Sequence, residues 1–174
     1  FTQNYLYYFN QTMSMNHSWK IGFNFGLTSG VITTLGLMIG LNASTHSKLV
    51  VLGGILTIAI ADSLSDAMGI HMSEESENKH TNKEIWQSTF AAFLSKLIMA
   101  LTFVIPVLTL PLETAIIASI IWGLLLISVL SFKIAKQQKE KPWKIVLEHI
   151  GLTIVVIILT HFIGMLIANL FGGI

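Results

Sequence analysis

Long apolar stretches alternate with short polar segments along this chain, and this pattern indicates the fold class. A helix needs about 20 residues to cross the hydrocarbon core of a bilayer. Five stretches are long enough, over residues 21–43, 49–72, 86–110, 112–132 and 145–171. None alternates with the period of two that a membrane β-barrel requires. The pattern predicts an all-α integral membrane protein with five transmembrane helices in residues 21–174, preceded by a separate segment over residues 1–20.

The composition agrees with a membrane protein and excludes several other classes. Hydrophobic residues make up 53% of the 174 residues and charged residues only 11%, whereas soluble domains are about 25% charged. The formal net charge of +1 provides no basic surface for nucleic acid. The absence of cysteine excludes disulfides and thiolate chemistry. We therefore expect the lipid bilayer as a partner, no nucleic acid, and no ordinary soluble enzyme.

The polar connections predict the orientation of the spans. The segment Lys133–Lys144 carries five lysines, and lysine-rich loops remain on the cytoplasmic side. Because each span reverses direction, the N-terminus and the Glu74–Ile85 loop are also expected in the cytoplasm. The 45–48 loop and the C-terminus then lie outside or in a lumen. Residues 1–20 lack the features of a cleavable signal, and their aromatic residues fit a cytoplasmic segment at the membrane interface.

Two carboxylates lie inside the second predicted span, where ionisable groups are costly and usually functional. Asp62 and Asp66 are four residues apart, which places both on one face of a helix. Ser65 shares that face. Such a pair can coordinate a divalent cation whose shell water completes, or it can exchange protons. The alternative is that one aspartate is protonated or ion-paired and serves only helix packing.

Other candidate ligands lie on the same span or farther along the chain. Met68 and His71 present a thioether and an imidazole that suit a transition metal, although methionine in a span more often serves packing. If the second helix continues past residue 72, Glu74 and Glu77 can attract cations to the cytoplasmic mouth; otherwise they belong to a solvated loop. His161 can pass protons or bind metal, or it can simply hydrogen-bond a neighbour.

Lys96 interrupts the third predicted span at mid-depth. The second and third spans are antiparallel, and Lys96 and Asp62 are equally far from their cytoplasmic ends. A lysine at this depth reaches the membrane surface poorly. We therefore expect Lys96 either to form an ion pair with Asp62 or to act as an internal cation that occupies the site when metal is absent.

The first predicted span is built for close packing. Gly26 and Gly30, and again Gly36 and Gly40, form small-xxx-small pairs that let helices approach closely. Ser29 adds a hydroxyl at mid-depth, on what can be a pathway. Such a helix suits either a dimer seam or the wall of a pore.

The order and spacing of these motifs resemble the vacuolar iron transporter family. The similar segments are Ser29–Gly40, Ala61–Asp66, Gly69–His71, Ser73–Glu77 and Leu159–Gly164. The resemblance implies a homodimer whose pathway lies between protomers and is lined by the first two helices. It further implies export of Fe²⁺, and often Mn²⁺, from the cytosol in exchange for protons.

This chain resembles a short, divergent member of that family. Asp62 matches the acidic position of the second helix, whereas Ser29 stands where the family has aspartate. Asp66 stands in place of methionine, and Ile70 in place of glutamate. A carboxylate in place of a thioether shifts preference towards harder ions. The long cytoplasmic metal-binding domain of many members is reduced here to residues 73–85.

The leading interpretation is a divalent metal transporter, an antiporter of metal and protons, with the metal as substrate and no covalently bound cofactor. A non-transporting membrane scaffold or metal sensor is the alternative, because the aspartate of the first span is absent and Lys96 intrudes. An intramembrane hydrolase is a remote alternative: Ser95 and Lys96 are adjacent, so they point in different directions on a helix. We therefore expect no enzyme.

Overall fold

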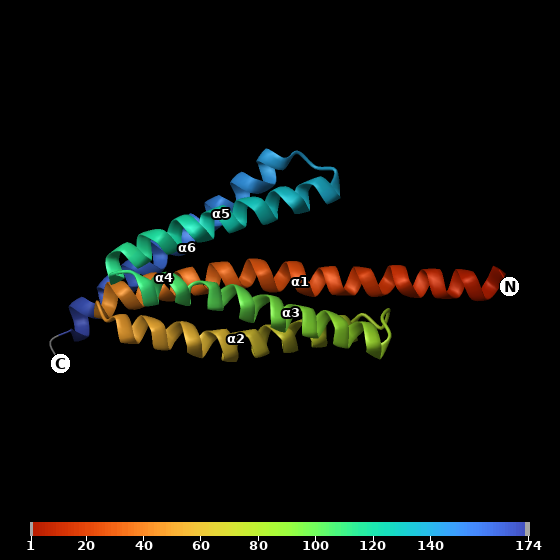
Figure 1. Cartoon of the computed structure of the whole chain (residues 1–174), viewed down its shortest axis with the longest axis horizontal. Helices are drawn as coiled ribbons and strands as arrows, with labels where there is room; N and C mark the ends of the chain where they lie inside the picture. The colour runs from red at the N-terminus through yellow and green to blue at the C-terminus, as the bar shows by residue number, and fades with distance from the viewer. Residues whose placement is uncertain (1, 173–174) are drawn as a thin grey trace.

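The computed structural model describes the backbone of residues 2–172 and the side chains of residues 18–172. Six helices follow one another (Figure 1): α1 (Thr2–Thr45), α2 (Lys48–Ser76), α3 (Asn82–Thr102), α4 (Val104–Thr109), α5 (Leu112–Gln138) and α6 (Pro142–Phe171). The predicted all-α class is confirmed, since five helical stretches are long and apolar enough to cross a membrane, with α3 and α4 forming one of them. The chain is a multi-pass integral membrane protein. The predicted interfacial position of residues 1–20 falls largely on side chains outside the described residues and stays a prediction.

The helices are longer than the apolar stretches that predicted them. α2 continues past Met72 to Ser76, and α5 continues past Phe132 to Gln138. A helix ends where the backbone or a cap ends it, not where the hydrocarbon ends. Lys139 stops α5 with a left-handed backbone, and Thr81 begins α3 through a reciprocal capping box with Glu84. The third helix therefore begins before residue 86, where the apolar stretch begins. The Thr-x-x-Glu spacing is the sequence feature that could have predicted this start.

The third span is interrupted at Phe103, where α3 gives way to α4. Pro106 lies one turn beyond and has no N–H, so it cannot donate to the carbonyl of Thr102. Beside this break, the Thr102 hydroxyl accepts a hydrogen bond from Trp122 Nε1 of α5 at 3.2 Å, which links α3 to α5. The carbonyls at the end of α4 are held by Lys48, whose Nζ donates to the Leu110 oxygen at 3.0 Å and to the Leu108 oxygen at 3.3 Å.

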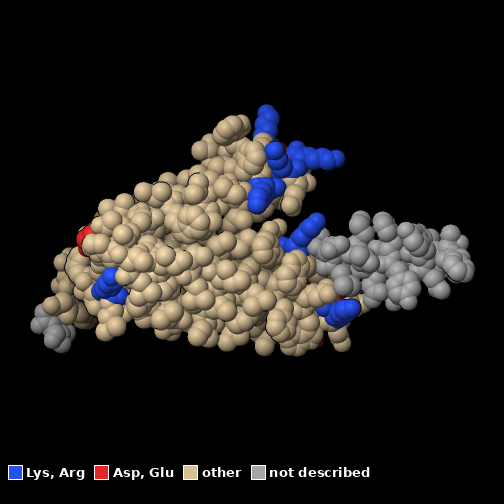
Figure 2. Space-filling view, in the orientation of Figure 1, with Lys and Arg blue, Asp and Glu red and all other residues tan. Residues whose placement is uncertain are grey.

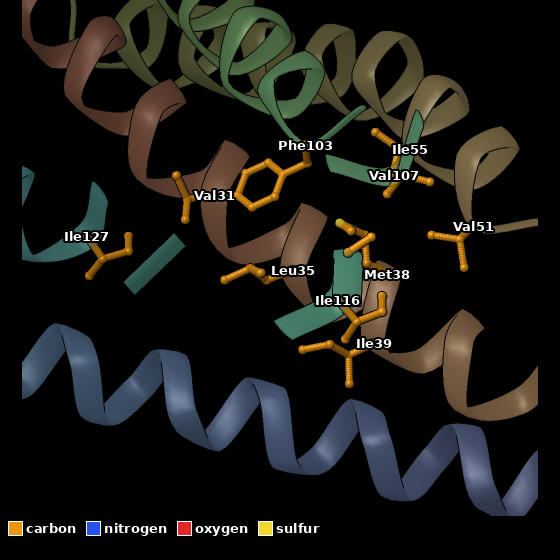
Figure 3. Close-up of a cluster of buried hydrophobic side chains, with 11 residues drawn as sticks. Val31, Leu35, Met38, Ile39, Val51, Ile55, Phe103, Val107, Ile116 and Ile127 are labelled. Carbon is orange, nitrogen blue, oxygen red and sulfur yellow. The ribbon is translucent and has the colours of Figure 1, made fainter. Parts of the chain in front are cut away.

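α1 is the central helix and packs against α2, α3, α5 and α6. Its middle provides Val31, Leu35 and Met38 to a fully buried apolar cluster, where Phe103 and Val107 meet them from the interrupted third span (Figure 3). Burying such side chains stabilises by about 1.5–3 kcal/mol each in a soluble protein, but between membrane helices close packing supplies the attraction.

Gly26, Gly30, Gly36 and Gly40 of α1 pack inside the chain. A Cβ at Gly26 would collide with the Ala92 carbonyl of α3, and one at Gly30 would lie 3.1 Å from the Lys96 carbonyl. Gly36 and Gly40 face α6, where the backbones of Gly40 and Gly164 meet. These close contacts are made with α3 and α6 of the same chain, whereas the sequence suggested a dimer seam or a pore wall.

Lysines gather at one end of the bundle. Figure 2 shows them at the α5–α6 connection and near the start of α3, and it shows lysine also at the opposite end, where α2 begins at Lys48. Towards the lysine-rich end, the α5–α6 hairpin diverges from α1 (Figure 1). This distribution agrees with the alternation of five spans, while the side of the membrane on which each end lies stays a prediction.

Candidate ion site at the centre of the bundle

Two helices bring a lysine and two aspartates together in the middle of the bundle. Lys96 of α3 is almost fully buried, with 2% of its side chain exposed. Its Nζ lies 2.5 Å from Asp62 Oδ2 of α2 and also contacts Asp66 Oδ2. The structure therefore contains the expected ion pair between Lys96 and Asp62, and Asp66 shares it.

Ser29 of α1 completes this network. Its hydroxyl donates to Asp66 Oδ2 at 2.6 Å and accepts from Lys96 Nζ at 2.9 Å. An ammonium has three protons to donate, and here it meets three oxygen atoms. A buried charge is tolerated when it is paired and hydrogen-bonded, so the network explains how a lysine can lie at this depth.

The helix packing places each group. Gly30 brings α1 close to the backbone of Lys96, which puts the neighbouring Ser29 within reach of the ammonium. The spacing of four residues directs Asp62 and Asp66 to the same neighbouring helix. The two carboxylates are more accessible than the lysine, with 33% and 21% of their side chains exposed. The site therefore has a sealed cationic side and an open acidic side.

The open side of the site adjoins a groove of about 820 Å³ between α1, α2 and α6. Its walls are mostly apolar, and among the described residues that line it Asp62 is the one with a charge. Thr33 and Thr160 add hydroxyls, although each donates to a carbonyl of its own helix. The groove thus opens onto Asp62.

The remaining predicted ligands lie elsewhere. Met68 is 58% exposed on the outer surface of α2, and Ser65 is exposed as well. His71 turns to α3, where its Nδ1 lies 3.0 Å from Thr89 Oγ1 and its ring contacts Trp86 edge to face. His161 is exposed on α6, with its ring against Phe162.

The predicted cytoplasmic-end acids also remain separate from the central pair. α2 does continue past residue 72, but Glu74 is buried with its Oε2 3.5 Å from His80 Nε2. Glu77 is exposed and pairs with Lys79 at 3.5 Å. The Glu74–His80 pair was not predicted, and only the exact end of α2 could have signalled it.

Within the part of the chain that the structure describes, no group of three or more His, Asp or Glu side chains is arranged to hold a metal ion. The central site offers two carboxylates with a net charge of −1 once the ammonium is counted. It can bind a cation by exchanging it for the Lys96 ammonium, with a hydroxyl and water as further ligands.

The contact of Ser29 with Lys96 also bears on the hydrolase alternative. A serine and a lysine 2.9 Å apart resemble a nucleophile and its base. A lysine must be an uncharged amine to act as a general base, however, and the partners of Lys96 are two carboxylates, which pair with an ammonium. The Ser29 hydroxyl donates to Asp66 and not to the lysine, so the geometry does not favour hydrolysis.

Comparison with family models finds one match, to the VIT family, over residues 23–85. This segment runs from α1 through α2 to the first turn of α3 and contains Ser29, Asp62 and Asp66, while Lys96 lies beyond it. No curated protein and no solved structure matches the chain. The similarity to the VIT family therefore covers the first two membrane helices of the chain.

Proposed function

We propose that this chain transports divalent metal ions, Fe²⁺ or Mn²⁺, out of the cytosol in exchange for protons. The match of residues 23–85 to the VIT family supports metal-ion transport across a membrane in general. The observation that supports the finer proposal is the pair Asp62 and Asp66, half-open in the middle of α2 and inside the matched segment.

The chemistry of the pair supports a divalent substrate. Carboxylate oxygens are ligands for Fe²⁺ and Mn²⁺ as well as for harder ions, and two carboxylates balance the charge of one divalent ion. Protons compete with the ion for the same oxygens. This competition for the carboxylates is the basis of the proposed coupling.

A homodimer is part of the proposal. The groove between α1, α2 and α6 leaves Asp62 open to the side of the bundle, where lipid would be a poor neighbour for a carboxylate. A second protomer against α1 and α2 would cover that opening and enclose an aqueous pathway. The resemblance to the family favours the same arrangement.

Flux into proteoliposomes tests the function. We expect wild-type protein to move Fe²⁺ and Mn²⁺ while an internal dye reports opposing proton movement. Asp62→Asn removes the carboxylate that faces the groove but leaves Lys96 paired with Asp66, so this variant should fold and lose flux. Glu113→Gln, on the exposed surface of α5, is the matched control and should transport normally. Unchanged flux in Asp62→Asn would overturn the assignment.

A metal sensor or scaffold is the second candidate, favoured by one observation. Lys96 already neutralises half of the acidic pair, which suits a protein that binds metal without passing it on. Wild-type protein that binds Mn²⁺ in an Asp62-dependent manner but shows no flux of either ion would support this candidate over the transporter.

A further inference from the structure

We propose that Lys96 is a tethered competitor of the transported ion, whose ammonium occupies the ion's position and keeps its binding weak enough for release. The inference rests on the proposed function of the same site. It assigns a specificity-determining role to a residue that lies outside the segment matched by the family model.

The Lys96 ammonium lies where a bridging ion would bind. Lys96 Nζ contacts Oδ2 of Asp62 and Oδ2 of Asp66 at once. A divalent ion that bridges these two oxygen atoms needs the space that the ammonium fills. Occupation of the pair by the ion and occupation by Lys96 therefore exclude each other.

The net charge of the site also disfavours simultaneous binding of the ammonium and the ion. With Lys96 in place the site has a net charge of −1, and a divalent ion added to it would leave +1. Like charges a few ångströms apart repel strongly in a medium of low dielectric. With the ammonium withdrawn from the pair, the same ion leaves the site neutral. Ion binding must therefore break the contacts of Lys96, and their loss weakens the net affinity.

The geometry also gives the order of the exchange. Asp62 is the more exposed carboxylate and lines the groove, so an arriving ion meets it first. Lys96 then still holds Asp66 and the Ser29 hydroxyl. The long, flexible stem of Lys96 lets its ammonium move away from the carboxylates while it stays near the Ser29 hydroxyl. When the ammonium returns to both carboxylates, it displaces the ion. Lys96 thus promotes release of the ion.

A purely structural role predicts something different. If Lys96 only neutralises two buried acids to hold α2 against α3, removing its charge lowers stability without tightening ion binding. If Lys96 competes with the ion, removing its charge tightens binding and slows release. Affinity and turnover therefore change in opposite directions only under the second role.

The test measures Mn²⁺ binding to the purified full chain by titration calorimetry, beside flux in proteoliposomes. In Lys96→Met we expect binding about tenfold tighter or more, with a lower KM and a lower maximal flux. Lys96→Arg keeps the charge and should bind as weakly as wild type. Lys133→Met removes a lysine that lies exposed at the end of α5 and is the matched control, with no change expected.

Several results would overturn the inference. Lys96→Met that binds Mn²⁺ no tighter than wild type contradicts it, and if wild type still transports, the proposed function survives alone. Tighter binding that persists after Asp62→Asn is added places the ion elsewhere and also contradicts it. If wild type shows no flux while Lys96→Met binds tightly through Asp62, transport fails and the competition stands. Lys96→Gln, which retains two donors for the carboxylates, replaces the methionine variant if that variant does not fold.

Discussion

Two carboxylates of α2, Asp66 and Glu74, each contact a basic side chain, and the more deeply buried one has the poorer hydrogen bonding. In the middle of α2, Asp66 Oδ2 accepts from both Ser29 and Lys96 although 21% of its side chain is exposed. At the end of α2, Glu74 is more deeply buried, yet its Oε2 has only the His80 contact at 3.5 Å and no hydrogen bond within the described structure. The more accessible carboxylate is the better satisfied one.

The difference indicates which of the two carboxylates can exchange a bound partner for an ion. A carboxylate with several charged or polar partners can exchange one partner for another at modest cost. A buried carboxylate with one long contact gains little from that contact and carries the cost of its own desolvation. The central network is therefore suited to exchange, and the end pair is suited to little beyond positioning the end of α2.

The largest expected effect on stability comes from stripping the central network of its acids. Asp62→Asn/Asp66→Asn leaves the Lys96 ammonium buried without a carboxylate, which costs about 3–5 kcal/mol. Adding Lys96→Met removes the stranded charge and should restore most of the loss. Thermal unfolding in one detergent compares the double and triple variants. Equal stability of the two would contradict the charge argument.

A smaller loss is expected when the hydroxyl of the network is removed. Ser29→Ala takes one acceptor from Lys96 and one donor from Asp66, which costs about 1–3 kcal/mol because a buried donor loses its partner. Thr28→Ala, one residue away, loses only a bond to its own helix at Asn24 and serves as the control. A Ser29→Ala protein as stable as the control would show that the hydroxyl is dispensable.

The smallest effect on stability is expected at the end of α2. Glu74→Leu removes a buried carboxylate whose Oε2 lacks a hydrogen bond among the described residues, so the free energy of unfolding should change by less than about 1 kcal/mol or increase slightly. The same unfolding measurement checks this. A loss as large as that of the double aspartate variant would mean that the His80 contact is much stronger than its length suggests, and the contrast between the two regions would disappear.

Most of the fold and part of the site could be predicted from the sequence. The lengths of the apolar stretches gave the five spans, and depth counted along antiparallel helices placed Lys96 beside Asp62. The share of Asp66 and Ser29 in the same contact depends on how α1, α2 and α3 are rotated about their axes, which residue counting does not supply. For the same reason the glycines of α1 indicated close packing but not α3 and α6 as their partners.

The Glu74–His80 pair illustrates a different limit. The apolar pattern predicts only the part of a helix that lies in the hydrocarbon. It therefore does not predict the last turn of α2, which continues into polar sequence as far as Ser76. The placement of Glu74 depends on that turn and on the backbone reversal at Asn78, whose φ is 52°. Neither is encoded in hydropathy, and both depend on local backbone conformation.

The hydrogen bonds from Lys48 to the carbonyls at the end of α4 have a mechanical consequence. They fasten the α1–α2 turn to the interrupted third span at one end of the bundle, while at the other end the α5–α6 hairpin already stands apart from α1 (Figure 1). Helices that are held together at one end can move apart most at the other end. We therefore expect the displacements that open the central site to be smallest beside Lys48 and to grow towards the lysine-rich end.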